Sequence, residues 1–266
     1  MMEILSFTPV WRGLIVLILG GFAFPITGIY VIRMNLLPLR FMLMHGVLLG
    51  GAVSLVLQLN PLFGSLAVNV LIAVFMASAS RSLKIDLGWV SAFMMVLAMG
   101  LASILIYSYD VPAKDTMSLL WGSPFALTWS DLGFMGFFSV LLIAYHTVFY
   151  RQIKALFFDR EIAFTVGVNE KVHYYALILI IAVTVAAAIR LVGALLMDAL
   201  LLLPAIIASI QAKSLKSIFI TASIWGGFFS AAGFFVSIAL DFPVSGSISV
   251  LSAAVFIILY AMRRKK

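Results

Sequence analysis

A few ionisable side chains lie inside or at the end of long apolar stretches of this chain, among them His45, Asp198 and Asp241. An imidazole and two carboxylates supply nitrogen and oxygen donors of the kind that bind divalent transition metals. The chain contains no cysteine, so disulfides and thiolate ligands are excluded, and a metal ion would depend on His, Asp, Glu or Met. These three residues are therefore the candidate metal ligands.

His45 has only apolar neighbours one helical turn away, with Phe41 and Met42 before it and Leu48 and Leu49 after it. A metal ion bound at His45 would take its further ligands from other helices. The alternative is a structural histidine whose ring is hydrogen-bonded to a backbone carbonyl.

Asp198 lies in the segment 194–204, which contains no other polar side chain. A carboxylate in such a segment must face a cavity, carry a proton or pair with a cation, and Arg190 about two turns away could be that cation. Asp241 precedes Phe242 and a proline at the end of an apolar stretch. A solvated turn residue is the alternative to a metal ligand there.

The elements that must position these residues are membrane helices. Only 10% of the 266 residues are charged and 64% are apolar, whereas a soluble domain needs far more charge. Several stretches reach the ~20 residues that a helix needs to cross ~30 Å of hydrocarbon, and they lack the period-2 alternation of a β-barrel. We predict an all-α, polytopic membrane helix bundle of about nine spans. They are predicted at 13–32, 40–57, 62–79, 87–107, 131–150, 172–189, 192–210, 217–240 and 246–262.

The net charge of +7 is interpreted as a signal of topology, and nucleic acid is not an expected partner, because the basic residues lie at the ends of apolar stretches. With an odd number of spans, the N-terminus outside and the C-terminus cytoplasmic, fourteen of the 17 Lys and Arg residues fall on the inner side. These are Arg33, Arg40, Arg81, Lys84, Arg151, Lys154, Arg160, Lys171, Lys213, Lys216, Arg263, Arg264, Lys265 and Lys266.

The segment 172–210 leaves one part of this topology open. It is a long apolar run that Arg190 and Gly193 interrupt. Two spans joined by a tight turn at 185–195 would fit it, and so would one span followed by a re-entrant piece.

The spans occupy most of the chain, so we predict a single transmembrane domain over residues 1–266 with no soluble catalytic domain. The sequence contains no Gly-Lys dipeptide, and a phosphate-binding loop of the Walker type is therefore absent. Any ATP hydrolysis must come from a partner. Of the two longer hydrophilic loops, 108–130 is expected outside and 151–171 inside.

The inner loop contains a segment typical of a short capped helix. Asp159 can cap a helix whose first turn holds Glu161, and Gly167 suits its C-terminal stop. Together with Ala163, these residues resemble the coupling segment Asp-Pro-Glu-x-Ala-x-x-x-Gly of the zinc and manganese permease family of ATP-binding cassette importers. Arg160 stands where that family usually has proline.

The resemblance extends through most of the chain. Val192-Gly-Ala-Leu-Leu-Met-Asp-Ala-Leu-Leu-Leu-Leu-Pro-Ala205 is similar to the family's Val-Gly-x-Leu-Leu-x-x-Ala-Leu-Leu-x-x-Pro-Ala stretch, and segments 28–33, 120–131 and 240–246 also resemble family patterns. Five such segments in the right order, on a matching hydropathy profile, are specific for the family.

The resemblance implies a non-enzymatic permease subunit of a bacterial importer in the cytoplasmic (inner) membrane, carrying zinc or manganese and holding no permanent cofactor. Two copies would form the path through the bilayer, cytoplasmic ATP-binding subunits would hydrolyse ATP, and an extracytoplasmic metal-binding protein would deliver the ion. Asp159, Arg160, Glu161 and Gly167 would couple the ATPase to the pore.

One departure from the family affects the metal path. The family usually begins its second span with Asp-Ala-x-x-His, whereas this chain has Phe41 in the place of the acid and keeps His45. Asp198 stands where relatives usually carry a small or hydroxyl residue. We hypothesise that Asp198 supplies the missing carboxylate from another helix, forming a transient site with His45 and Asp241.

Other functions remain open at this point. A permease for an organic cargo, such as a metal chelate or a cobalamin-like compound, would share the architecture without requiring His45 or Asp198. An ATP-independent secondary cation transporter would usually carry more intramembrane acids on broken helices. A membrane-embedded enzyme is disfavoured, because the sequence contains no HExxH motif and no nucleophile and base pair.

Overall fold

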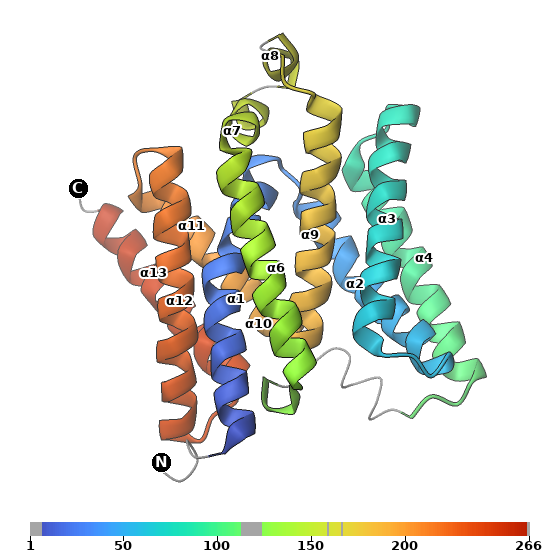
Figure 1. Ribbon diagram of the computed structural model, residues 1–266, viewed down its shortest axis with the longest axis vertical. Coiled ribbons are helices and arrows are strands. Elements are labelled where there is room, and N and C mark those ends of the chain that lie inside the picture. The colour runs from blue at the N-terminus through green and yellow to red at the C-terminus, as the bar shows by residue number, and fades with distance from the viewer. Residues whose placement is uncertain (1–6, 113–123, 159, 166, 265–266) are drawn as a thin grey trace. The chain divides into compact units, whose positions relative to one another are not determined.

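The computed structural model describes residues 7–112, 124–158, 160–165 and 167–264 (Figure 1). These residues form helices and no strands. The helices are α1 (Thr8–Arg33), α2 (Leu37–Val56), α3 (Pro61–Leu83), α4 (Leu87–Ser108), the 3-10 turn η2 (Pro124–Ala126), α6 (Trp129–Val148), α7 (Tyr150–Phe158), α8 (Arg160–Thr165), α9 (Glu170–Val192), α10 (Ala194–Leu201), α11 (Leu203–Gln211), α12 (Leu215–Leu240) and α13 (Val244–Arg264).

Eight of the described helices are long and apolar enough to cross a membrane: α1, α2, α3, α4, α6, α9, α12 and α13. Each coincides with a predicted span, so the predicted all-α, polytopic bundle is confirmed. One of the nine predicted spans, 192–210, has no single long helix. It is divided between the two short helices α10 and α11.

The division of this segment follows from two residues. Gly193 has φ 92° and ψ 161°, a backbone conformation that is essentially restricted to glycine, and it separates α9 from α10. Pro204 lies in the first turn of α11 and has no N–H to donate to the carbonyl of Leu200, so α10 ends just before it. Within 185–195 the helix is thus interrupted at Gly193.

The chain folds into two compact units. The first comprises Met1–Ile29, Gly122–Ile143 and Leu191–Lys266, and the second comprises Tyr30–Trp121 and Ala144–Arg190. That these units act as one permease domain over residues 1–266 stays a prediction.

Within the first unit, helices approach so closely that only glycine fits between them. A Cβ on Gly28 of α1 would overlap the carbonyl of Leu201 at the end of α10, and a Cβ on Gly226 of α12 would lie 2.6 Å from Pro25 of α1. Such close approach is the usual source of helix association in a bilayer, where lipid offers no hydrophobic drive for helices to associate.

The start of α1 and the end of α13, both in the first unit, lie at opposite ends of it (Figure 1). Eight full crossings alone would bring the chain back to the face from which it started. A ninth crossing by the segment 194–211 would fit this arrangement, since its 18 residues reach roughly 27 Å at about 1.5 Å per residue. The odd number of crossings expected from the charge pattern stays a prediction.

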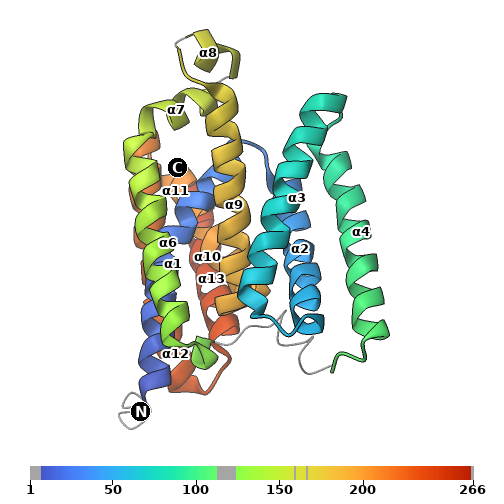
Figure 2. The same cartoon turned by 45° about the vertical axis from the view of Figure 1, so that its right-hand side comes forward.

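Within the second unit, α2 packs against α3 and α4. The end of α3, the start of α9 and the short helices α7 and α8 all lie at one end of this unit (Figures 1 and 2), which we call the basic end. Its basic residues are Arg81, Lys84, Arg151, Lys154 and Lys171. The turns 57–60 and 109–112 at the other end contain no Lys or Arg.

Candidate functional site

His45 lies on α2 and is half-buried. Its Nδ1 lies 2.9 Å from the backbone carbonyl oxygen of Phe41, one turn earlier on the same helix. A carbonyl can only accept a hydrogen bond, so Nδ1 must carry the proton and donate it. In the neutral ring the lone pair is then on Nε2, the nitrogen left to bind a metal ion, an orientation typical of histidine ligands.

The depth of His45 differs from the expected one. Helix α2 begins at Leu37, three residues before the predicted start at residue 40, with Pro38 in its first turn. His45 is therefore eight residues into the helix, or roughly 12 Å at about 1.5 Å per residue. The ring lies well inside the span.

Residue 41, where the family usually has an acid, cannot serve a cation here. The guanidinium of Arg40 lies 4.5 Å from the centroid of the Phe41 ring. Arg40 itself is fully buried. The side chain of Phe41 has no nitrogen, oxygen or sulfur atom with which to bind a metal ion. A carboxylate ligand for His45 has to come from elsewhere in the protein.

Asp198 lies in α10, in the middle of the segment between Gly193 and Pro204. Asp198 is half-buried, and α10 packs against α13 and α12. Its backbone carbonyl accepts the N–H of Leu202 at 3.0 Å, which closes the last turn of α10. The short helix thus places a carboxylate among apolar residues.

Asp241 ends α12 in the left-handed conformation with φ 55° and is exposed. The turn is fixed by Ser237, whose carbonyl accepts the N–H of Phe242 at 3.0 Å and whose hydroxyl donates to the Phe242 carbonyl at 2.6 Å. Asp241 is thus an exposed turn residue, and its role as a metal ligand stays a prediction. Its carboxylate remains accessible to an ion.

The three candidate residues are distributed over the two units. His45 belongs to the second unit, and Asp198 and Asp241 belong to the first. Among the described residues, no three His, Asp or Glu side chains are grouped so that they could hold a metal ion. The three-residue metal site stays a prediction.

The inner segment forms α7 and α8, followed by a turn. Gly167 has φ +78°, its N–H donates to the Phe164 carbonyl at 3.0 Å, and the N–H of Val168 donates to the Ala163 carbonyl at 3.0 Å. The predicted helix stop at Gly167 is confirmed. Asp159 lies outside the described residues, as do the side chains of Arg160 and Glu161.

A groove of about 380 Å³ lies behind this turn. It is lined by Phe164, Gly167, Val168, Asn169, Glu170 and Lys171.

Residues 6–263 match the ABC 3 transport family. This chain belongs to that family. It is 25% identical over 257 residues to the manganese import system permease protein ScaB of Streptococcus gordonii, covering 96% of this chain and 91% of the relative. It is 23% identical to the high-affinity zinc uptake system membrane protein ZnuB of Haemophilus influenzae, covering 90% and 91%.

The fold of this ABC 3 family member is also that of a solved structure. PsaBC from Streptococcus pneumoniae, determined in complex with Fab, gives a TM-score of 0.83 at 24% identity, covering 96% of this chain and 91% of the other. The resemblance stated from the sequence is confirmed at the level of family and fold.

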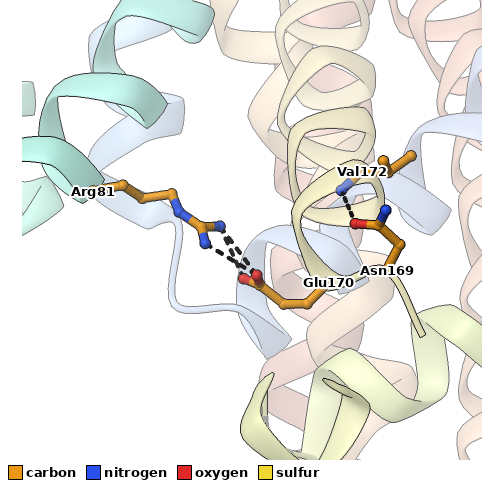
Figure 3. Close-up of polar contacts among 4 residues, drawn as sticks. All are labelled: Arg81, Asn169, Glu170 and Val172. Carbon is orange, nitrogen blue, oxygen red and sulfur yellow. Dashed lines mark hydrogen bonds and ion pairs between the residues drawn. The ribbon is translucent and has the colours of Figure 1, made fainter. Parts of the chain in front are cut away.

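Sequence reasoning missed one side-chain pair at the basic end of this ABC 3 family protein. Arg81, counted from the sequence only as a topology signal, forms an ion pair with Glu170 (Figure 3). The two residues are 89 positions apart, and the sequence signal is no more than one basic and one acidic residue at the ends of two predicted spans.

Proposed function

We propose that this chain is the membrane-spanning permease subunit of a bacterial ATP-binding cassette importer that carries divalent metal ions, zinc or manganese, into the cell. The observation that carries the proposal is similarity over almost the whole chain to permeases named for manganese import and zinc uptake, within one family. ATP would be hydrolysed by a separate subunit, because this chain has no Walker-type loop.

The donor chemistry of the candidate residues supports a metal cargo. His45 offers Nε2, held in orientation by the Phe41 carbonyl, and Asp198 offers a carboxylate within the membrane segment. Asp241 offers a solvent-accessible carboxylate at the end of α12 opposite the chain's C-terminus. A transported ion needs few ligands, because tight binding would trap it in transit. We propose these three residues as the ligands of a transient site.

The partners follow from the same proposal. With the basic end and the C-terminus cytoplasmic, the segment 151–171 would meet the ATP-binding subunits, and Asp159, Arg160, Glu161 and Gly167 would form its coupling residues. An extracytoplasmic metal-binding protein would deliver the ion, and a second copy of this chain would complete the path in the bacterial inner membrane.

A first test measures ATP hydrolysis by the complex of permease and ATPase in lipid, with the binding protein added empty or loaded with zinc or manganese. We expect the metal-loaded protein to stimulate hydrolysis several-fold over the empty one, because delivery of the ion favours the state in which the ATPase subunits close. Stimulation only by a binding protein loaded with an organic cargo would overturn the assignment of the cargo.

His45→Ala is expected to reduce metal uptake by at least about tenfold per assembled complex, since loss of even a supporting group of a metal ligand costs about 10–100-fold. The neighbouring Met44→Ala, which also truncates a half-buried side chain of α2, is the control. Uptake is measured with radioactive or isotopically enriched metal. If both variants transport equally and His45→Ala only lowers thermal stability, the structural reading of this histidine is the correct one.

A further inference from the structure

The ion pair between Arg81 and Glu170 joins the last turn of α3 to the first residue of α9. Arg81 Nη1 donates to Glu170 Oε1 at 3.0 Å and to Oε2 at 3.2 Å, and Nη2 donates to Oε2 at 3.1 Å. Figure 3 shows the guanidinium facing the carboxylate across the space between the two helices. The pair therefore has the two-pronged geometry that makes arginine bridges specific.

The surroundings hold both partners in place. Their side chains are 30% and 13% exposed, so water screens the pair only in part. The guanidinium lies 5.8 Å from the ring centroid of Tyr174, one turn further along α9. Glu170 at the start of α9 and Arg81 at the end of α3 each carry the charge that their helix dipole favours. Asn169 caps α9 by accepting the N–H of Val172 at 3.3 Å.

Glu170 is also the first residue of α9 and lies at the end of the segment 151–171, which is proposed to meet the ATPase. It lines the groove behind α8 together with Phe164 and Gly167. Only Val168 and Asn169 separate it from Gly167, and the N–H of Val168 is bonded to the end of α8. A displacement of α8 would therefore reach Glu170 through a short, hydrogen-bonded turn.

On the other side of the bridge, α3 is closely packed against α2, the helix that carries His45. A Cβ on Gly50 would lie 2.6 Å from the backbone of Ser65. The Ser65 hydroxyl donates to the Val47 carbonyl at 3.1 Å, and both Ser65 and Asn69 are fully buried. Backbones in such contact cannot slide without a clash, so α2 and α3 are expected to move together.

We propose that the Arg81–Glu170 bridge transmits movement of the coupling segment to the α2–α3 pair, and so to His45. The inference rests on the proposed function. All of its parts, from α8 through Glu170 and Arg81 to His45, lie within the second unit. Arg81 is a positioning residue that touches neither the ion nor the ATPase, and its loss should separate ATP hydrolysis from transport.

The test compares the number of ATP molecules hydrolysed per ion taken up by the full complex in proteoliposomes. Arg81→Gln and Glu170→Gln are each expected to raise this ratio at least about threefold, the scale at which residues along a coupling network act. Lys84→Gln removes the same charge from an exposed residue just after α3 and should keep the wild-type ratio.

A reversed pair distinguishes transmission from mere stability. Arg81→Glu and Glu170→Arg should each raise the ratio, and the double variant should bring it back toward the wild-type value because the ion pair is restored in reverse. Arg81→Lys keeps the positive charge but loses the two-pronged hydrogen bonding of the guanidinium, so it should give an intermediate ratio. This variant replaces Arg81→Gln in the test if Arg81→Gln fails to assemble.

A wild-type ratio in assembled Arg81→Gln and Glu170→Gln complexes would overturn the inference, and so would equal losses of hydrolysis and uptake. The ratio is measured with the cargo that the wild type carries. A wild type that moves an organic cargo instead of metal therefore contradicts the proposed function, while the ratio still decides for or against the bridge.

Discussion

Asp198→Asn should lower ATP-driven uptake of zinc or manganese by about tenfold or more, equivalent to about 1.4 kcal/mol of lost interaction with the ion. The amide keeps the shape of the side chain but removes the negative charge with which Asp198 of α10 would bind a divalent cation. If the carboxylate were only structural, its neutralisation would weaken a contact within the protein and lower the thermal midpoint, while uptake per assembled complex would stay unchanged. Uptake and the thermal midpoint should therefore move independently.

Asp110→Asn is the matched control for this substitution. Asp110 is exposed and has a left-handed backbone with φ 48°, which asparagine adopts as readily as aspartate. The control should transport at the wild-type rate. Equal uptake by Asp198→Asn, Asp110→Asn and the wild type would remove Asp198 from the metal path.

Gly28→Ala should destabilise the protein by about 1–3 kcal/mol, toward the upper end of the range for overpacked sites. The added methyl group would overlap the carbonyl of Leu201 and lie 3.3 Å from the Cβ of Ala205. The carbonyl belongs to the backbone and cannot rotate away, so α1 would have to separate from α10 and α11. The apparent midpoint of thermal unfolding in lipid nanodiscs, at one fixed scan rate, measures the effect.

Gly100→Ala makes the same chemical change in the interior of α4, where nothing lies within 4 Å of the added atom. Alanine favours a helix over glycine by about 0.8–1 kcal/mol, so this variant should be as stable as the wild type or more so. Identical midpoints for Gly28→Ala and the wild type would contradict the close packing of α1 against Leu201.

The helices were predictable because the bilayer imposes a length of apolar sequence that few other structures require. The break inside 192–210 was harder, since α10 and α11 are as apolar as a continuous span. Its cause was nevertheless visible in the sequence as Gly193 and Pro204, and both residues act through the backbone conformations available to them.

For the candidate site, the sequence predicted which residues could take part and some of their local contacts, but not which residues pair across the fold. The solvated turn at Asp241 follows from the helix end before a proline, and the carbonyl partner of His45 follows from its position one turn after Phe41. The pairing of Arg81 with Glu170 depends on how α3 and α9 lie in the folded unit, which no local pattern encodes. Long-range side-chain pairs of this kind require the tertiary structure.

The central claim, that this member of the ABC 3 family imports divalent metal, is tested most directly by uptake into proteoliposomes. The permease would be reconstituted with its ATPase and binding protein, and the uptake of zinc, manganese and a cobalamin-like compound would be compared with and without ATP. We predict ATP-dependent uptake of zinc or manganese and none of the organic compound. ATP-dependent uptake of the organic compound, with neither metal moving, would contradict the account.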